Sequence, residues 1–114
     1  ALEAGAASMT ICEVAPGVGL ASTGFEGVAV YQVIAGTLHL RLPNGSTHRA
    51  AAGELVLVPA GVEPVLTARE GVVGELVDGR SCLRRRGAWL VADATRGRGA
   101  ELVVAATRIR ATSP

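Results

Sequence analysis

Apolar and polar residues alternate with a period of two along most of this chain, and no convincing stretch of helical periodicity interrupts them. The clearest alternation covers residues 37–42, where three leucines take turns with Thr37, His39 and Arg41. Successive side chains of a β-strand point to opposite faces, so this pattern predicts a strand with one buried and one exposed face. We therefore expect His39 to be an exposed side chain.

The dipeptide Asn44-Gly45 follows this run, and it is a strong hairpin signal because both residues tolerate a positive φ. The predicted return strand is Ser46–Ala50, and residues 17–27 are expected to form a loose connection. Further short apolar runs predict strands at Thr10–Val14, Val28–Ile34, Leu55–Val58, Pro64–Ala68, Val72–Val77, Ala88–Ala92 and Leu102–Ile109. Eight or nine short strands at fairly regular spacing predict an all-β sandwich or barrel.

The composition agrees with one small β domain. The 114 residues are 49% hydrophobic and 18% charged, and they include 15 Gly and 5 Pro, which suits a packed core joined by many tight turns. We expect residues 9–112 to form the domain and residues 1–8 to be a flexible arm or a remnant of cloning.

The charge of the chain favours no nucleic-acid or membrane partner. A net charge of +1 gives no long-range field, and no apolar stretch approaches the roughly 18 residues of a membrane span. The basic run Arg84–Arg86 is expected to be a solvated strand end or loop. Cys12 and Cys82 lie far apart with no CxxC spacing or secretory leader, so we expect a cytoplasmic protein with two reduced, inert thiols.

Two stretches resemble the conserved motifs of the cupin superfamily. Residues 53–61, Gly-Glu-Leu-Val-Leu-Val-Pro-Ala-Gly, match the second motif of that family, and they predict a strand buried on both faces followed by a Pro-x-Gly turn. Residues 31–40 match the end of the first motif, where a strand reaches a Gly turn at Gly36 and a second strand follows. The resemblance implies a single small cupin barrel, a jelly roll of the double-stranded β-helix type.

The same resemblance implies that the metal ligands of a cupin enzyme are missing. The position of the family's glutamate is Ala29, its His-x-His region falls within 22–25, and its last histidine position is Pro64. Alanine and proline offer no side-chain donor, and a lone hydroxyl is a poor one. We therefore expect no metal and no cofactor.

A closer resemblance implies a function class. The runs 15–20, 30–36 and 52–59 are similar to the N-terminal sensing barrel of AraC-like transcription regulators, which bind a small effector inside the barrel. This chain has no room for the helix-turn-helix units of those regulators, so we expect no direct nucleic-acid binding. The first hypothesis is a metal-independent, small-molecule-binding regulatory domain that forms a homodimer. The alternatives are a metal-free enzyme of the sugar epimerase, isomerase or cyclase type, with Tyr31 and His48 as its acid–base pair, and a structural module.

The expected ligand-binding residues are those that point inward in this register or offer an aromatic edge. They are Tyr31, Val33, Leu38, Leu40, His48 and Trp89. Tyrosine and tryptophan combine a flat apolar surface with one hydrogen-bonding group, which suits the orientation of a ring or a sugar. The same side chains are equally well explained as core, and His48 as a histidine at the barrel rim. Glu54, Glu63 and Glu75 are candidate acids, but no pair of them is matched for acid–base work.

Overall fold

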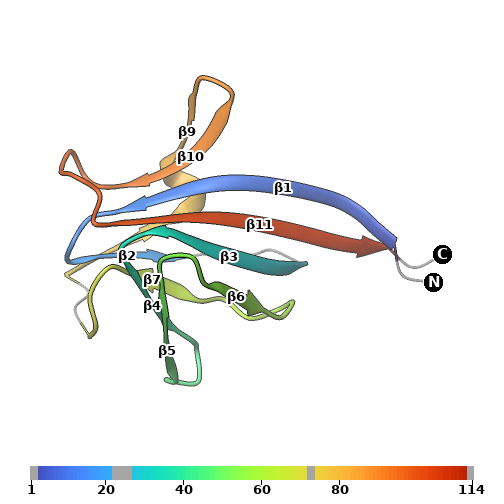
Figure 1. The fold of residues 1–114 in the computed structure, drawn as a ribbon, viewed down its shortest axis with the longest axis horizontal. Helices are drawn as coiled ribbons and strands as arrows, with labels where there is room; N and C mark the ends of the chain where they lie inside the picture. Colours follow the sequence, from blue (N-terminus) through green and yellow to red (C-terminus); the bar gives the residue numbers. More distant parts are fainter. Residues whose placement is uncertain (1–2, 22–26, 72–73, 113–114) are drawn as a thin grey trace.

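Two β-sheets face each other and enclose the apolar side chains of the chain (Figure 1). The computed structural model describes residues 3–21, 27–71 and 74–112. The first sheet has the order β6 (Leu55–Val58), β3 (Val28–Ala35), β11 (Leu102–Thr112), β1 (Glu3–Val14), β10 (Trp89–Ala94) and β9 (Leu83–Arg86). The second has the order β5 (Thr47–Ala51), β4 (Thr37–Arg41), β7 (Val65–Thr67), β2 (Val18–Ala21) and β8 (Glu75–Asp78).

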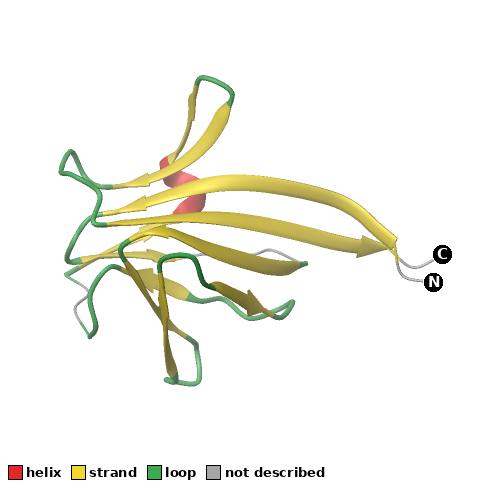
Figure 2. Cartoon of the chain, viewed as in Figure 1, coloured by secondary structure: helices red, strands yellow, loops and turns green. Residues whose placement is uncertain are grey.

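The all-β class is confirmed. Within the described ranges, helical structure is confined to one 3-10 segment, η1 (Gly79–Cys82), between β8 and β9 (Figure 2). Both sheets are mixed, because β1 pairs with β10 and β2 pairs with β8 in parallel, while the other neighbours are antiparallel. This arrangement is consistent with the expected small barrel or jelly roll. No helix in the described segments has the length and apolar character needed to cross a membrane.

The two longest strands, β1 and β11, form a ribbon that runs past the rest of the sandwich (Figure 1). They pair antiparallel from Glu3 opposite Thr112 to Val14 opposite Leu102. The first strand therefore begins at Glu3 rather than at the expected Thr10, and the expected division between an arm at 1–8 and a domain from 9 does not coincide with an element boundary.

The Asn-Gly hairpin is confirmed. Strands β4 and β5 pair from Thr37 opposite Ala51 to Arg41 opposite Thr47. In the turn, the amide of Leu42 donates to the carbonyl of Ser46 over 2.9 Å, and Gly45 has a φ of +87°. The side chain of Asn44 accepts hydrogen bonds from the amide and the hydroxyl of Ser46. These contacts fix the register of the hairpin.

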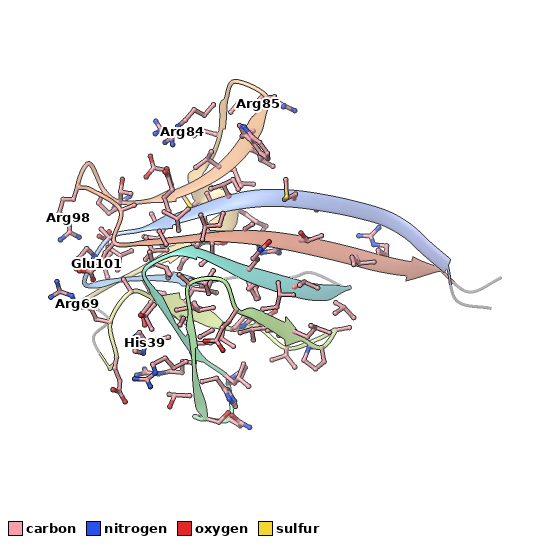
Figure 3. All side chains as sticks on the ribbon, viewed as in Figure 1. His39, Arg69, Arg84, Arg85, Arg98 and Glu101 are labelled. Carbon is pink, nitrogen blue, oxygen red and sulfur yellow. The ribbon has the colours of Figure 1, made fainter. Side chains whose placement is uncertain are left out.

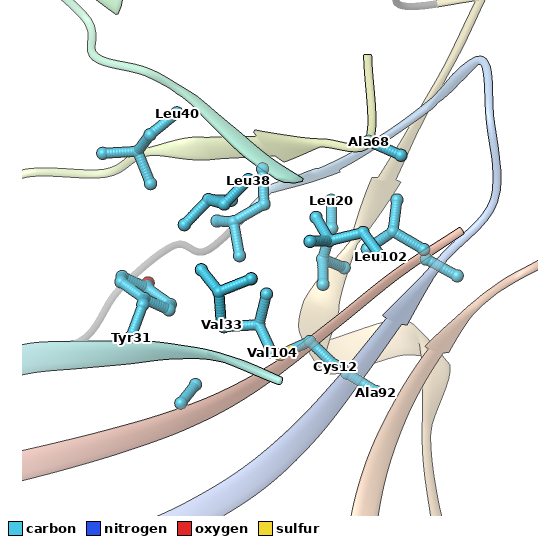
Figure 4. Close-up of a cluster of buried hydrophobic side chains, with 14 of the residues drawn as sticks. Cys12, Leu20, Tyr31, Val33, Leu38, Leu40, Ala68, Ala92, Leu102 and Val104 are labelled. Atoms are coloured by element: carbon cyan, nitrogen blue, oxygen red, sulfur yellow. The ribbon is translucent and has the colours of Figure 1, made fainter. Parts of the chain in front are cut away.

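The core lies where the inward rows of the two sheets meet (Figure 4). Tyr31 and Val33 of β3 are 1% exposed, and Leu38 and Leu40 of β4 are 0% and 2% exposed. The predicted alternation of this segment is therefore confirmed, with His39 on the opposite, half-buried face. At one end of the sandwich, Arg69 donates two hydrogen bonds of 2.9 Å to the carboxylate of Glu101 (Figure 3), which ties the end of β7 to the start of β11. This contact holds the pKa of Glu101 below its usual value.

Three strand predictions need correction. Residues 18–21, expected within a loose connection, form β2, which lies between β7 and the edge strand β8 in the second sheet. Residues 83–86 form the edge strand β9, which was not predicted, although the arginine run is exposed at a strand end as expected. Of the expected strand 72–77, residues 72 and 73 lie outside the described residues, and the strand observed there is β8 (Glu75–Asp78).

Strand β6 is not buried on both faces. It pairs only with β3 and forms the edge of the first sheet, and its side chains Leu55 and Leu57 are 60% and 67% exposed. The continuous apolar run at 55–58 therefore correctly predicted a strand. The prediction that both faces of this strand are buried is wrong for a single copy of the chain. The alternate residues Val56 and Val58 do pack toward the core.

Candidate ligand-binding site

A cavity of about 230 Å³ lies inside the sandwich, between the inner face of the first sheet and strand β2 with the η1 segment that follows β8. Its apolar walls come from both sheets and include Leu20, Leu66, Leu90 and Ala92. An engineered apolar cavity of about 150 Å³ is large enough to hold benzene. The volume therefore suits a molecule with one six-membered ring or a short branched chain.

Most polar groups of the cavity come from two neighbouring rows of the first sheet. Thr10 and Tyr31 each pair with Ala106, and Arg108 pairs with both Ser8 and Ala29. Residues that pair across a sheet share a face, so these rows carry hydroxyl groups and a guanidinium to the same inner surface. Thr10, Tyr31, Ser8 and Arg108 all line the cavity. Arg80 of η1 also lines the cavity, and its Nε lies 3.9 Å from Oδ1 of Asp78. The site therefore combines apolar walls with two guanidinium groups and several hydroxyls.

Cys12 lines the same cavity, but its chemistry is that of an inert thiol. Its side chain is 4% exposed, and burial raises its pKa to about 12, although the charge of Arg108 acts in the opposite direction. Burial also raises the pKa of Cys82, whose Sγ donates to the carbonyl of Gly79. The thiolate is the nucleophilic form, so neither cysteine is activated for covalent catalysis.

Cys12 is therefore expected to resist alkylation in the native protein. At pH 8, raising the pKa from 9.0 to about 12 lowers the thiolate fraction about a thousandfold, and the low exposure slows the reaction further. Treatment with iodoacetamide followed by mass spectrometry of the peptides measures this, with the same protein in urea as the control. Equal labelling of Cys12 in the native and unfolded states would contradict the buried, protonated thiol.

The structure brings only some of the expected site residues together. Tyr31 lines the interior cavity, whereas Val33 and Leu38 are core side chains, and Leu40 is buried at the β4–β5 side of the sandwich. His48 pairs with Leu40 and so shares its face as expected, but β5 is an edge strand and His48 is exposed. Trp89 is 52% exposed, and it is its neighbour Leu90 that lines the cavity.

The proposed acid–base pair is consequently separated. Tyr31 faces the interior cavity, and His48 lines a groove of about 150 Å³ along β4, β5 and β7. His39, Arg41 and Arg49 also line this groove. Tyr31 and His48 therefore line different cavities.

The polar site residues that the sequence analysis missed include Arg108, Arg80, Thr10 and Ser8. The sequence did contain an indication of Arg108. This residue follows Val104 and Ala106 at intervals of two, so it shares the face of the strand on which those two side chains are buried. A single charged residue on such a face is uncommon and marks a paired group or a functional site.

The other charged residues of interest have structural partners. Glu54 accepts a hydrogen bond of 2.6 Å from the amide of Ala51, and Glu75 forms an ion pair of 2.8 Å with Arg96. In the arginine run, Arg84 pairs with Asp93 at 2.7 Å and Arg86 pairs with Glu13 at 2.8 Å. The bonds from Thr95 to the carboxylate of Asp93, followed by the charges of Arg84 and Arg86, hold the pKa of Asp93 below its usual value.

The metal positions implied by the cupin resemblance fall on buried residues or outside the description. Ala29 is 8% exposed on the inner face, Pro64 is buried, and residues 22–25 lie outside the described residues. Within 3–21, 27–71 and 74–112, no three His, Cys, Asp or Glu side chains lie close enough together to hold a metal ion.

Comparison with models of known protein families, with curated protein sequences and with solved structures found no match to this chain.

Proposed function

We propose that this chain is a small-molecule-binding domain whose interior cavity holds a compact, mostly apolar ligand with one anionic group. The observation that carries the proposal is the cavity of about 230 Å³ with apolar walls and Arg108 in its lining. Ligand sites are usually concave and mostly apolar, with a few polar groups that fix the orientation of the ligand. This cavity has that composition.

Arg108 favours a carboxylate as the anionic group. A guanidinium carries five N–H donors in a planar fork, so it can engage both oxygens of a carboxylate while it keeps other partners. Enclosure between the sheets strengthens this attraction, because a charge pair is screened less there than in open water. The ring of Tyr31 provides a flat wall next to this group.

The chemistry of the cavity supports binding rather than covalent catalysis. Its thiol is protonated, and the charged residues that line it, Arg80 and Arg108, carry guanidinium groups, which do not exchange protons at neutral pH. The resemblance of residues 15–20, 30–36 and 52–59 to AraC-like sensing barrels gives independent support. We accordingly propose a metal-independent cupin domain with a sensing or regulatory role in the cytoplasm.

Benzoate is a suitable probe because it joins one ring to one carboxylate. In the presence of EDTA, we expect benzoate to raise the melting temperature by about 5 °C at ten times its Kd, which corresponds to about 1.4 kcal/mol. Benzamide, which has the same shape without the charge, should bind at least about tenfold more weakly, since it lacks the charge-assisted bond to Arg108. Thermal shift and isothermal titration calorimetry measure both ligands.

The variant Arg108→Gln should bind benzoate at least about tenfold more weakly than the original chain. Arg41→Gln is the matched control, because it removes the same charge from an exposed position on β4 outside the cavity. If neither benzoate nor benzamide nor a panel of small sugars and aliphatic acids stabilises the protein, the proposal fails. If benzamide binds as tightly as benzoate and Arg108→Gln changes nothing, the anionic part of the proposal fails.

A further inference from the structure

The outer face of the first sheet carries several large, exposed apolar side chains. Eight large apolar side chains are exposed among the described residues, and five of them point outward from this sheet: Met9, Val28, Leu55, Leu57 and Trp89. They belong to β1, β3, β6 and β10, which together with β11 are five adjacent strands. We call the surface formed by these five strands the outer apolar face.

The other sheet shows what a solvated face looks like in the same molecule. The outward positions of β4 and of its neighbour β5 hold His39, Arg41, Thr47 and Arg49. An antiparallel sheet with one face in water normally has this alternation of apolar and polar residues. The outer apolar face lacks this alternation of apolar and polar residues. The Leu-Val-Leu-Val run of β6 has the composition of a strand whose two faces are both covered.

The size of the outer apolar face is sufficient for a stable interface. Five strands about 4.8 Å apart span about 19 Å, and the residues from 28 to 34 at about 3.3 Å each span about 20 Å, which gives a flat footprint of about 400 Å². A standard interface buries about 800 Å² on each partner, of which about 500 Å² is apolar in homodimers. The accessible area of a surface covered by side chains exceeds its flat footprint, so the two values are comparable.

The charges at the border of this face favour a second copy of the same chain over a charged partner. Glu13 and Asp93 lie in one row at its edge, and they are already neutralised by Arg86 and Arg84. The centre of the face contains Gln32 and Thr107 as its polar residues, and no charged side chain lies between them. A surface without net charge does not repel its own copy, and a depletion of charge in the core with a polar rim is typical of interfaces.

We propose that two copies of this chain associate face to face through the outer apolar face, as an isologous dimer with two-fold symmetry. In this dimer the two first sheets pack against each other, and β6 becomes a strand with both faces covered. Trp89 and Leu57 supply the large apolar contacts that dominate the energy of such interfaces.

The test is sedimentation velocity from the low micromolar to the high micromolar range, with Leu57→Asp as the disrupting variant. We expect the original chain to sediment as a dimer and Leu57→Asp to weaken dimerisation at least about a hundredfold, because a carboxylate is then buried and desolvated within the apolar interface. Leu76→Asp is the matched control, since Leu76 is 60% exposed like Leu57 but lies on β8 of the other sheet.

The fluorescence of Trp89, the single tryptophan of the chain, gives a second readout. Its indole is half exposed in one copy, so dilution of the original chain should shift its emission to longer wavelength, and Leu57→Asp should show the shifted spectrum at every concentration. Circular dichroism confirms that both variants are folded. A monomer throughout the concentration range, or equal effects of Leu57→Asp and Leu76→Asp, would overturn the proposal.

Discussion

Replacing Gly36 with alanine is expected to destabilise the native state by about 3 kcal/mol or more. Gly36 joins β3 to β4 with a φ of +83°, and a left-handed conformation costs an L-residue about 1–2 kcal/mol. A Cβ at this position would also overlap the carbonyl oxygen of Glu101 and lie 3.3 Å from Cα of Leu102. Forced overlap in a packed region adds about 1–3 kcal/mol.

Gly53→Ala is the matched control for this prediction. Gly53 has a φ of +90°, but a Cβ there would meet no atom within 4 Å. Its replacement therefore carries only the backbone cost, about 1–2 kcal/mol. Urea denaturation followed by circular dichroism measures both variants. Because a domain of this size has a total stability of about 5–15 kcal/mol, the difference between them is easily resolved. Equal losses would show that the close approach of β11 to Gly36 has no energetic effect.

The predictions that succeeded rest on local physical chemistry. The alternation at 37–42 and the Asn-Gly turn fix a hairpin between neighbours in sequence, and the structure has that hairpin with the predicted faces. Gly36 was placed correctly at a turn between two strands for the same reason, since a positive φ selects glycine at a tight connection. These features need no knowledge of where the rest of the chain lies.

The predictions that failed depend on the order of strands in the sheets. Strand β6 reads as doubly buried, but Leu55 and Leu57 point to the outer face of the first sheet, where they are exposed, and the sequence of 55–58 does not reveal this position. His48 faces the predicted way, and its exposed position on the edge strand β5 agrees with the alternative of a histidine at the rim. Strand β2 was missed because four residues that include Gly19 give too short a pattern, although pairing with β7 and β8 on its two sides stabilises it.

The interior site shows the same division between local and non-local information. The inward direction of Tyr31 follows from the alternation of β3, and this direction is observed. That Arg108 comes beside the same cavity depends on the register of β11 with β1 and β3, which joins residues far apart in sequence. The strand 102–109 is apolar in most of its positions on both faces, so its period alone does not say which face is buried.

The variant Leu38→Ala tests whether Leu38 belongs to the core or to the ligand-binding site. Leu38 was expected to touch a ligand, but it is 0% exposed within the core cluster and does not line the interior cavity (Figure 4). Truncation of a fully buried leucine removes its apolar burial and leaves a cavity, so we expect a loss of about 3 kcal/mol in the free energy of unfolding. Leu76→Ala, at a 60% exposed position, should change this value by less than about 0.5 kcal/mol.

The affinity for benzoate should stay within about twofold of the original value in Leu38→Ala, measured by titration at low temperature where the variant remains folded, because distant sites contribute independently. A loss of stability without a loss of affinity identifies Leu38 as a core residue, since the ligand then has no contact that the truncation removes. A tenfold loss of benzoate affinity in the folded variant would instead place Leu38 at the ligand, and the binding site would extend from the β11 side of the cavity toward β4 as the sequence first indicated.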